Sequence, residues 1–130
     1  MGRSEGVDFL LPIGGGSVID TAKGIGYGIA NDFEMEDLLY GRVKTDKNLP
    51  IGVILTIAAA GSEMSSSMVL TIEDGMMKRS YGHDCSRPRF AIMNPELTYS
   101  LPAYQTASGA ADIMMHTMER YFTLQTQIPA

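Results

Sequence analysis

The sequence predicts an α/β fold built on a mostly parallel sheet, and three features carry that prediction. The short apolar run at residues 9–13 enters a glycine turn, as a buried strand does. A helix is predicted from Ser17 to about Ala30, because apolar residues recur there at spacings of four and three. A second apolar run at 51–56 ends in a loop of small residues. Strand, turn, helix and strand in this order are typical of a parallel sheet.

The rest of the chain adds shorter elements and one long helix. Further elements are expected at residues 35–39 (one helical turn), 67–72 and 77–82 (the two strands of a β-hairpin) and 90–93 (a short strand). Asp74-Gly75 supplies the turn of the hairpin. Pro102 begins a helix that runs to about Thr123, and little sequence follows for it to pack against. We therefore expect this helix to open a different layer of an incomplete domain.

Composition places the chain among globular proteins. It has 130 residues, of which 45% are hydrophobic and 19% are charged, the size and balance of one ordinary domain. No apolar run approaches the roughly 20 residues that span a bilayer, and the N-terminus lacks the apolar core of a secretory signal. The single cysteine, Cys85, rules out an internal disulfide framework. These features predict a cytoplasmic protein that does not insert into a membrane.

The charge pattern argues against a nucleic-acid partner. The net charge is −5, and the lysines and arginines are scattered along the sequence instead of clustered. A nucleic-acid surface would need a basic patch or stripe. On this pattern Lys23 and Lys78 are expected to be solvated side chains.

The glycine turn at 14–16 is a candidate phosphate site. It stands directly before a predicted helix, whose first N–H groups and positive dipole end favour an anion. The alternative is structural: Ser17 and Asp20 form a capping pair, and the glycines only make a tight turn. Because the full G-x-G-x-x-G fingerprint is absent, the pattern by itself leaves both interpretations open.

The long helix near the end of the chain carries a candidate metal site. Asp112, His116 and Glu119 are spaced i, i+4 and i+7, which places them on one face. Their oxygen and nitrogen atoms suit a divalent metal, although a catalytic site needs more ligands than the first two supply. The alternative is a solvated polar face. Under either interpretation, the opposite face is expected to pack on a core through Ala110, Met114, Met118 and Tyr121.

Four segments together resemble the iron-containing alcohol dehydrogenases. The segment 8–23, DFLLPIGGGSVIDTAK, is similar to the nucleotide-binding segment of that family. The loop 55–63, LTIAAAGSE, resembles its threonine-rich loop ending in Gly-Ser-Glu. The stretch from Asn94-Pro95 to Asp112 resembles its signature region. The fourth segment follows it, with His116 and Glu119 in the places that the family pattern gives them. The resemblance covers essentially the whole chain and is closest to the butanol-dehydrogenase-like branch.

The resemblance implies a fold and an activity. Residues 1–100 would be part of a Rossmann-like nucleotide-binding domain, and residues 101–130 the first long helix of an all-helical metal-binding domain. A cleft between them would hold NAD or NADP and a divalent metal, iron or zinc. Hydride would pass between the nicotinamide and a primary alcohol or aldehyde, with the metal polarising the substrate oxygen. The full-length parent would be a homodimer.

The resemblance also implies site residues. Asp112 and His116 match two of the family's metal ligands. The implied cofactor-binding residues are Gly15, Gly16, Ser17, Asp20, Thr56 and Lys78. Among these, Gly16 and Ser17 match positions on the pyrophosphate, and Lys78 matches a lysine near the nicotinamide ribose. No residue is assigned a separate catalytic role.

The chain also departs from the family. Ala60 stands where a second cofactor-binding threonine is frequent, so one hydroxyl contact is lost. Family members are several times longer, and two histidine ligands and the first βα unit fall outside these 130 residues. The chain thus resembles a middle fragment of such an enzyme. The alternative is a truncated, non-catalytic nucleotide-binding fragment of the same family.

Overall fold

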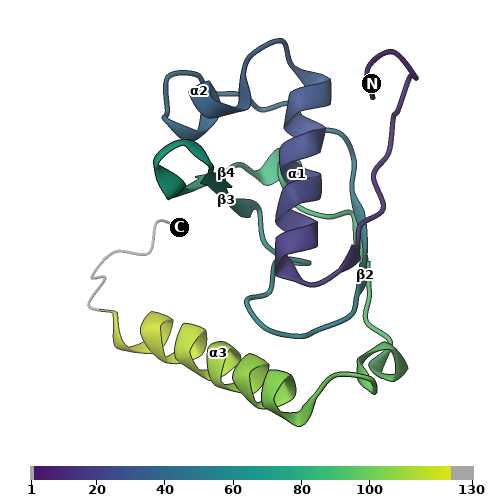
Figure 1. Cartoon of the computed structure of the whole chain (residues 1–130), viewed down its shortest axis with the longest axis vertical. Helices are drawn as coiled ribbons and strands as arrows, with labels where there is room; N and C mark the ends of the chain where they lie inside the picture. Colours follow the sequence, from purple (N-terminus) through teal and green to yellow (C-terminus); the bar gives the residue numbers. More distant parts are fainter. Residues whose placement is uncertain (1, 124–130) are drawn as a thin grey trace.

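A three-stranded parallel sheet forms one layer of the protein. The computed structural model describes residues 2–123 (Figure 1). Strands β1 (Ile13–Gly14), β2 (Gly52–Leu55) and β5 (Phe90–Ile92) lie in the order β1-β2-β5, and both pairings are parallel. The predicted α/β class with a parallel sheet is therefore confirmed. The first strand is shorter than the predicted 9–13: Leu10 forms only an isolated bridge with Ile51, because Pro12 has no N–H to continue the ladder.

Helix α1 (Gly16–Ala30) covers one face of this sheet, and it spans the residues that its apolar spacing predicted. Ile19 is fully buried against Ile51, Val53 and Leu55 of the sheet. A parallel sheet needs such a helix because its strands carry apolar side chains on both faces. This packing fixes the N-terminus of α1 beside the carboxyl ends of β1 and β2.

The other side of α1 packs against the hairpin and a short helix. Strands β3 (Ser67–Ile72) and β4 (Met77–Gly82) pair antiparallel, and the turn η1 (Asp74–Met76) joins them as the sequence predicted. Helix α2 (Met35–Leu39) lies over the same cluster. The buried members of this second cluster are Tyr27, Leu38, Leu39, Met68 and Ile72. Helix α1 therefore stands between two apolar clusters and joins them.

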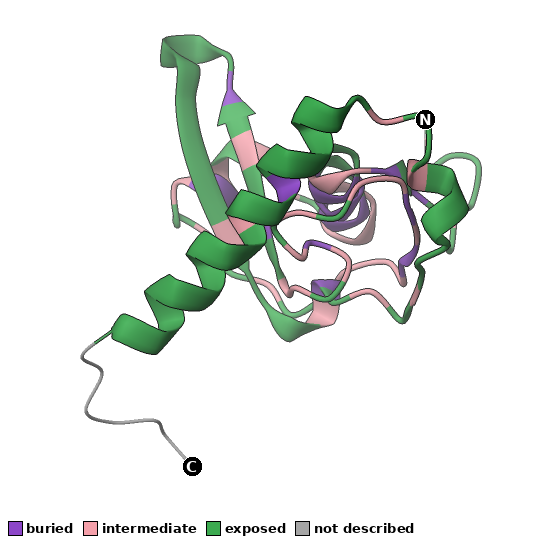
Figure 2. Ribbon diagram, turned by 90° about the horizontal axis from the view of Figure 1, so that it is seen from below, coloured by how far each residue is buried: buried purple, intermediate pink, exposed green. Residues whose placement is uncertain are grey.

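Helix α3 (Ala103–Phe122) stands apart from this body. The turn η2 (Asp84–Ser86) precedes β5, and the turn η3 (Pro95–Thr98) connects β5 to α3. Figure 1 shows α3 away from the sheet and α1, and in Figure 2 almost all of its residues are coloured as exposed. The apolar face predicted to pack on a core is exposed over the described residues, with Met114 62% and Tyr121 81% accessible. That expectation was wrong for these residues, because none of the described elements lies against that face.

The described residues contain no helix that is both long enough and apolar enough to cross a bilayer.

Candidate functional site

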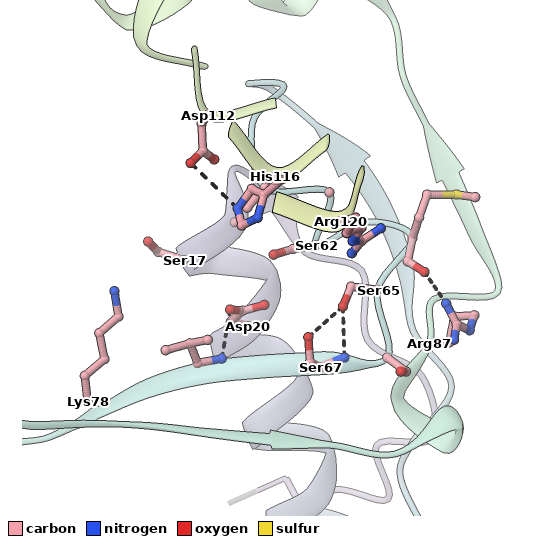
Figure 3. A pocket seen from close by; sticks show the side chains of 16 residues that line it. Ser17, Asp20, Ser62, Ser65, Ser67, Lys78, Arg87, Asp112, His116 and Arg120 are labelled. Atoms are coloured by element: carbon pink, nitrogen blue, oxygen red, sulfur yellow. Dashed lines mark hydrogen bonds and ion pairs between the residues drawn. The ribbon is translucent and has the colours of Figure 1, made fainter. Parts of the chain in front are cut away.

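An open pocket of about 970 Å³ lies between the N-terminus of α1, the loop after β2, the hairpin and α3. Figure 3 shows side chains from all these segments around it. The sequence-predicted residues that line it are Gly16, Ser17, Asp20, Lys78, Asp112 and His116. The structure thus brings the glycine turn and the acidic helix face together, although they are far apart in the sequence. The carboxyl end of a parallel sheet is where ligands bind in open α/β folds.

The glycine turn at the start of α1 does not contain the capping pair. Gly15 is the N-cap residue, and no side chain caps the helix. The Asp20 carboxylate is bound elsewhere, since its Oδ2 accepts a hydrogen bond from the Val69 N–H at 2.9 Å. The structural alternative for Ser17 and Asp20 is therefore not formed. What remains is a helix N-terminus that opens on the pocket, an arrangement that favours a negatively charged group.

Asp112 and His116 form the second half of the site. His116 Nε2 lies 3.7 Å from Asp112 Oδ1, and both side chains are about half exposed. Two donor atoms that each lie about 2.1 Å from one ion are about 3–4 Å apart, so this spacing fits a shared cation. His116 Nδ1 faces Glu119 Oε2 at 4.0 Å. Within residues 2–123, however, no group of three or more metal-capable side chains gathers.

Two of the predicted cofactor residues do not line the pocket. The Thr56 N–H donates to the Gly14 carbonyl at 3.1 Å, so its backbone extends the β1–β2 pairing at the sheet edge. A Cβ on Gly15 would lie against the Ile57 side chain. Both residues therefore shape the turn under the pocket and do not form its wall.

The buried lysine of α1 was missed. Lys23 was expected to be solvated, but its side chain is 0% exposed. Burial lowers the pKa of Lys23, and the nearby Asp20 and Glu63 carboxylates oppose that shift. The expectation failed because sequence spacing places Lys23 on α1 but does not reveal that the loop after β2 folds over it.

Two arginines of the pocket wall were also missed. Arg120 lies one turn beyond His116, so the same helical spacing that paired Asp112 with His116 already placed it on that face. Arg87 donates to the Met64 carbonyl at 2.6 Å and pairs with Asp84 at 2.8 Å. Its hydrogen bond and charge lower the pKa of the Asp84 carboxyl. No sequence pattern pointed to Arg87.

Comparison with known proteins identifies the family. The family model described as iron-containing alcohol dehydrogenase matches residues 1–95. NADH-dependent butanol dehydrogenase A of Clostridium acetobutylicum is 44% identical over 121 residues, which cover 93% of this chain and 31% of that protein. The NADPH-dependent aldehyde reductase YqhD of Escherichia coli is 37% identical over 125 residues, 93% of this chain and 32% of that protein.

Solved structures agree with the sequence relatives. The crystal structure of NADH-dependent butanol dehydrogenase A from Thermotoga maritima matches with a TM-score of 0.89 and 36% identity, covering 93% of this chain and 30% of that one. Sulfoacetaldehyde reductase from Bifidobacterium kashiwanohense, solved in complex with NAD+, matches with a TM-score of 0.89 and 32% identity, covering 98% and 34%. The chain spans about a third of the length of these relatives. The chain belongs to the iron-containing alcohol dehydrogenase family.

Proposed function

We propose that this chain is the middle part of a metal-dependent, NAD(P)-linked alcohol dehydrogenase or aldehyde reductase of the butanol-dehydrogenase-like type. One observation carries the proposal: the N-terminus of α1 and the Asp112–His116 pair line the same pocket. A nicotinamide dinucleotide anchored at the first would place its reactive end toward the second. The names of the sequence relatives, which include butanol dehydrogenases and an aldehyde reductase, support the same reaction class.

Residues 1–100 would bind the dinucleotide. The backbone at Gly15, Gly16 and Ser17 would receive the pyrophosphate, because the helix N-terminus offers N–H donors and a positive dipole end. Lys78 lines the pocket from β4, where its positive charge would face the cofactor. Asp20 and Thr56 belong to the same proposed cofactor set, Asp20 on the pocket wall and Thr56 at the sheet edge.

Residues 101–130 would begin a helical domain that holds an iron or zinc ion. Asp112 and His116 would supply two of its ligands, and the longer protein the others. Glu119 would hold the His116 ring in the orientation that turns Nε2 toward the ion, since its carboxylate faces Nδ1. When bound, such an ion supplies Lewis-acid polarisation of a substrate oxygen.

The test uses the longer protein that contains this chain, expressed from its full reading frame at about the length of its relatives. We expect oxidation of a primary alcohol such as butanol, or reduction of its aldehyde, only with a nicotinamide cofactor and with Fe²⁺ or Zn²⁺ present. Absorbance of the reduced nicotinamide follows the reaction. Turnover that persists undiminished after metal removal would overturn the metal assignment, and absence of dinucleotide binding would overturn the whole proposal.

A second candidate is a non-catalytic nucleotide-binding fragment. The observation that favours it is the number of ligands, because within residues 2–123 no group of three or more metal-capable side chains surrounds a common point. A catalytic ion needs three or more protein ligands. This candidate predicts that the 130-residue chain alone binds NADH but gives no change in nicotinamide absorbance with alcohol, aldehyde and added metal. Measurable turnover by the chain alone would exclude it.

A further inference from the structure

Lys23 occupies an unusual position for a lysine. Its side chain is fully buried, and its Nζ donates hydrogen bonds to three backbone carbonyls, two in the loop between β2 and β3 and one at the first residue of β3. The acceptors are Ser62 at 2.8 Å, Ser65 at 2.9 Å and Ser67 at 2.7 Å. An ammonium has three N–H donors, so every one of them is used.

Asp20 completes the arrangement one turn earlier on α1. Its Oδ1 lies 3.9 Å from Lys23 Nζ and has no hydrogen-bond partner among the described residues. Its Oδ2 accepts from the Val69 N–H. The two side chains therefore hold the same stretch of backbone from both ends, Lys23 through the carbonyls of 62–67 and Asp20 through the amide of 69. The carboxylate also offsets the cost of burying the ammonium.

The stretch that Lys23 holds is also a wall of the pocket. Ser62, Ser65 and Ser67 line the pocket, as Figure 3 shows, while their carbonyls point to Lys23. Other donors hold the residues between these acceptors: Arg87 donates to the Met64 carbonyl at 2.6 Å, and the Ser86 hydroxyl donates to the Ser66 carbonyl at 2.7 Å. Lys23 is the side-chain donor to the carbonyls of Ser62, Ser65 and Ser67. The Gly61 carbonyl accepts from Met64 and Ser65, and the left-handed φ of +77° at Gly61 sets the loop's start. Removal of Lys23 would leave three carbonyls without their donor, at a cost that favours rearrangement of the loop.

We propose that Lys23 is a positioning residue for the dinucleotide pocket: its buried ammonium fixes the serine-bearing wall against the N-terminal half of α1. The proposal rests on the proposed function for the identity of the ligand, but not for the mechanical role of Lys23. It predicts separate effects on the two halves of the site. The pocket wall formed by Ser62, Ser65 and Ser67 depends on Lys23. Asp112 and His116 are carried by α3 and, within residues 2–123, share no hydrogen bond or ion pair with this network.

The experiment compares Lys23→Met, which keeps the length of the side chain and removes its charge, with Lys44→Met at an exposed lysine. Backbone hydrogen exchange of residues 62–69 is measured without ligand, and NADH and Zn²⁺ affinities are measured on the same samples. In Lys23→Met we expect exchange in this segment to quicken by about tenfold or more and the Kd for NADH to rise by about tenfold, with unchanged Zn²⁺ binding. Lys44→Met should match the parent chain in all three.

In the longer protein, the same variant should raise KM for the dinucleotide by about tenfold and leave kcat within about twofold, because the hydride-transfer end of the site is not held by Lys23. A merely structural role would lower NADH binding and Zn²⁺ binding together. Parental exchange rates at 62–69 in Lys23→Met would overturn the proposal. Failure of the unsubstituted chain to bind NADH would instead overturn the proposed function, while the exchange data still decide the role of Lys23.

A measurement on the unsubstituted chain covers the case in which Lys23→Met does not fold. Nitrogen-detected NMR of lysine side chains should show one ammonium signal with slow proton exchange, assigned to Lys23 and close in space to residues 62–67. The other lysines should exchange quickly. If the Lys23 ammonium exchanges as fast as that of Lys44, Lys23 does not hold the carbonyls of Ser62, Ser65 and Ser67, and the proposal is wrong.

Discussion

Gly109 of α3 lies directly against the backbone carbonyl of Ala58, in the loop after β2. It is the single residue of α3 that the structure buries among the described residues. A Cβ at this position would fall inside contact distance of that carbonyl oxygen, and a backbone atom does not swing aside as a flexible side chain does. The absence of a side chain at 109 therefore sets how closely α3 approaches the sheet, and with it the placement of Asp112 and His116.

We expect Gly109→Ala to displace α3 and to weaken the metal site more than the fold. A displacement of about 1 Å can cost about 100-fold in turnover when catalytic groups are misplaced. Zn²⁺ affinity by titration calorimetry and kcat of the longer protein both check this. Ser108→Ala, at an exposed neighbouring position, is the matched control and should leave both unchanged. Parental Zn²⁺ affinity in Gly109→Ala would show that α3 is positioned by something else.

Asp112→Ala and His116→Ala should each lower Zn²⁺ affinity by more than about 100-fold, because each removes one of the two ligands that the chain supplies. Glu119→Gln should have a smaller effect, about tenfold, since Glu119 only faces the second ring nitrogen of His116. Competition with a chelating dye measures all three. Equal affinities across the series would mean that this helical face is only a solvated polar surface.

A larger side chain at the mouth of the pocket should block the dinucleotide. A Cβ on Gly16 would already lie 3.4 Å from Ser62 Oγ, so the added methyl groups of Gly16→Val occupy the space proposed for the pyrophosphate. We expect at least about a tenfold loss in NADH affinity by fluorescence titration, with Zn²⁺ binding retained.

Gly28→Ala provides the control for that substitution, because it changes another glycine of α1. Its Cβ would meet only the Met35 side chain, at 4.0 Å. This variant should bind NADH normally and gain up to about 1 kcal/mol in unfolding free energy, because alanine suits a helix interior better than glycine. If both variants lose NADH affinity equally, the effect comes from α1 as a whole and not from the pocket.

Tyr27 should make the protein less stable in alkali. Burial raises the pKa of Tyr27 above its ordinary value of about 10. Above that ordinary value the unfolded chain loses its phenol proton while the folded chain keeps it, so the unfolding free energy falls as the pH rises. Below about pH 9 the phenol is protonated in both states, and Tyr27 adds no pH dependence.

Urea unfolding of the parent and Tyr27→Phe at about pH 8 and about pH 10.5 measures this effect. At the lower pH, Tyr27→Phe should be less stable by about 1 kcal/mol, because the Cys85 thiol loses the Tyr27 oxygen that accepts its hydrogen bond. At the higher pH this difference in unfolding free energy between the parent and Tyr27→Phe should become smaller or change sign. Tyr99→Phe, at an exposed tyrosine, should show no such change in the gap. A gap that is the same at both pH values would contradict the prediction.

The sequence alone determined the elements and their class. Apolar periodicity located α1, the Asp-Gly turn located the β3–β4 hairpin, and the run at 51–56 located β2, because these signals are local and depend on residues close together in the chain. Local spacing also placed Asp112 and His116 on one face of α3. The family resemblance added the expectation that this face meets the glycine turn.

Only the tertiary structure decided which side chains are buried and which meet across the pocket. In the sequence Lys23 has the spacing of an ordinary charged helix residue, and its burial follows from the segment 62–67, whose carbonyls lie against its Nζ. In the same way, the sequence does not reveal that Gly109 lies against the carbonyl of Ala58, which leaves no room for a side chain at position 109. Periodicity reports the face of an element, but the partner of that face is set by long-range packing, which no local pattern encodes.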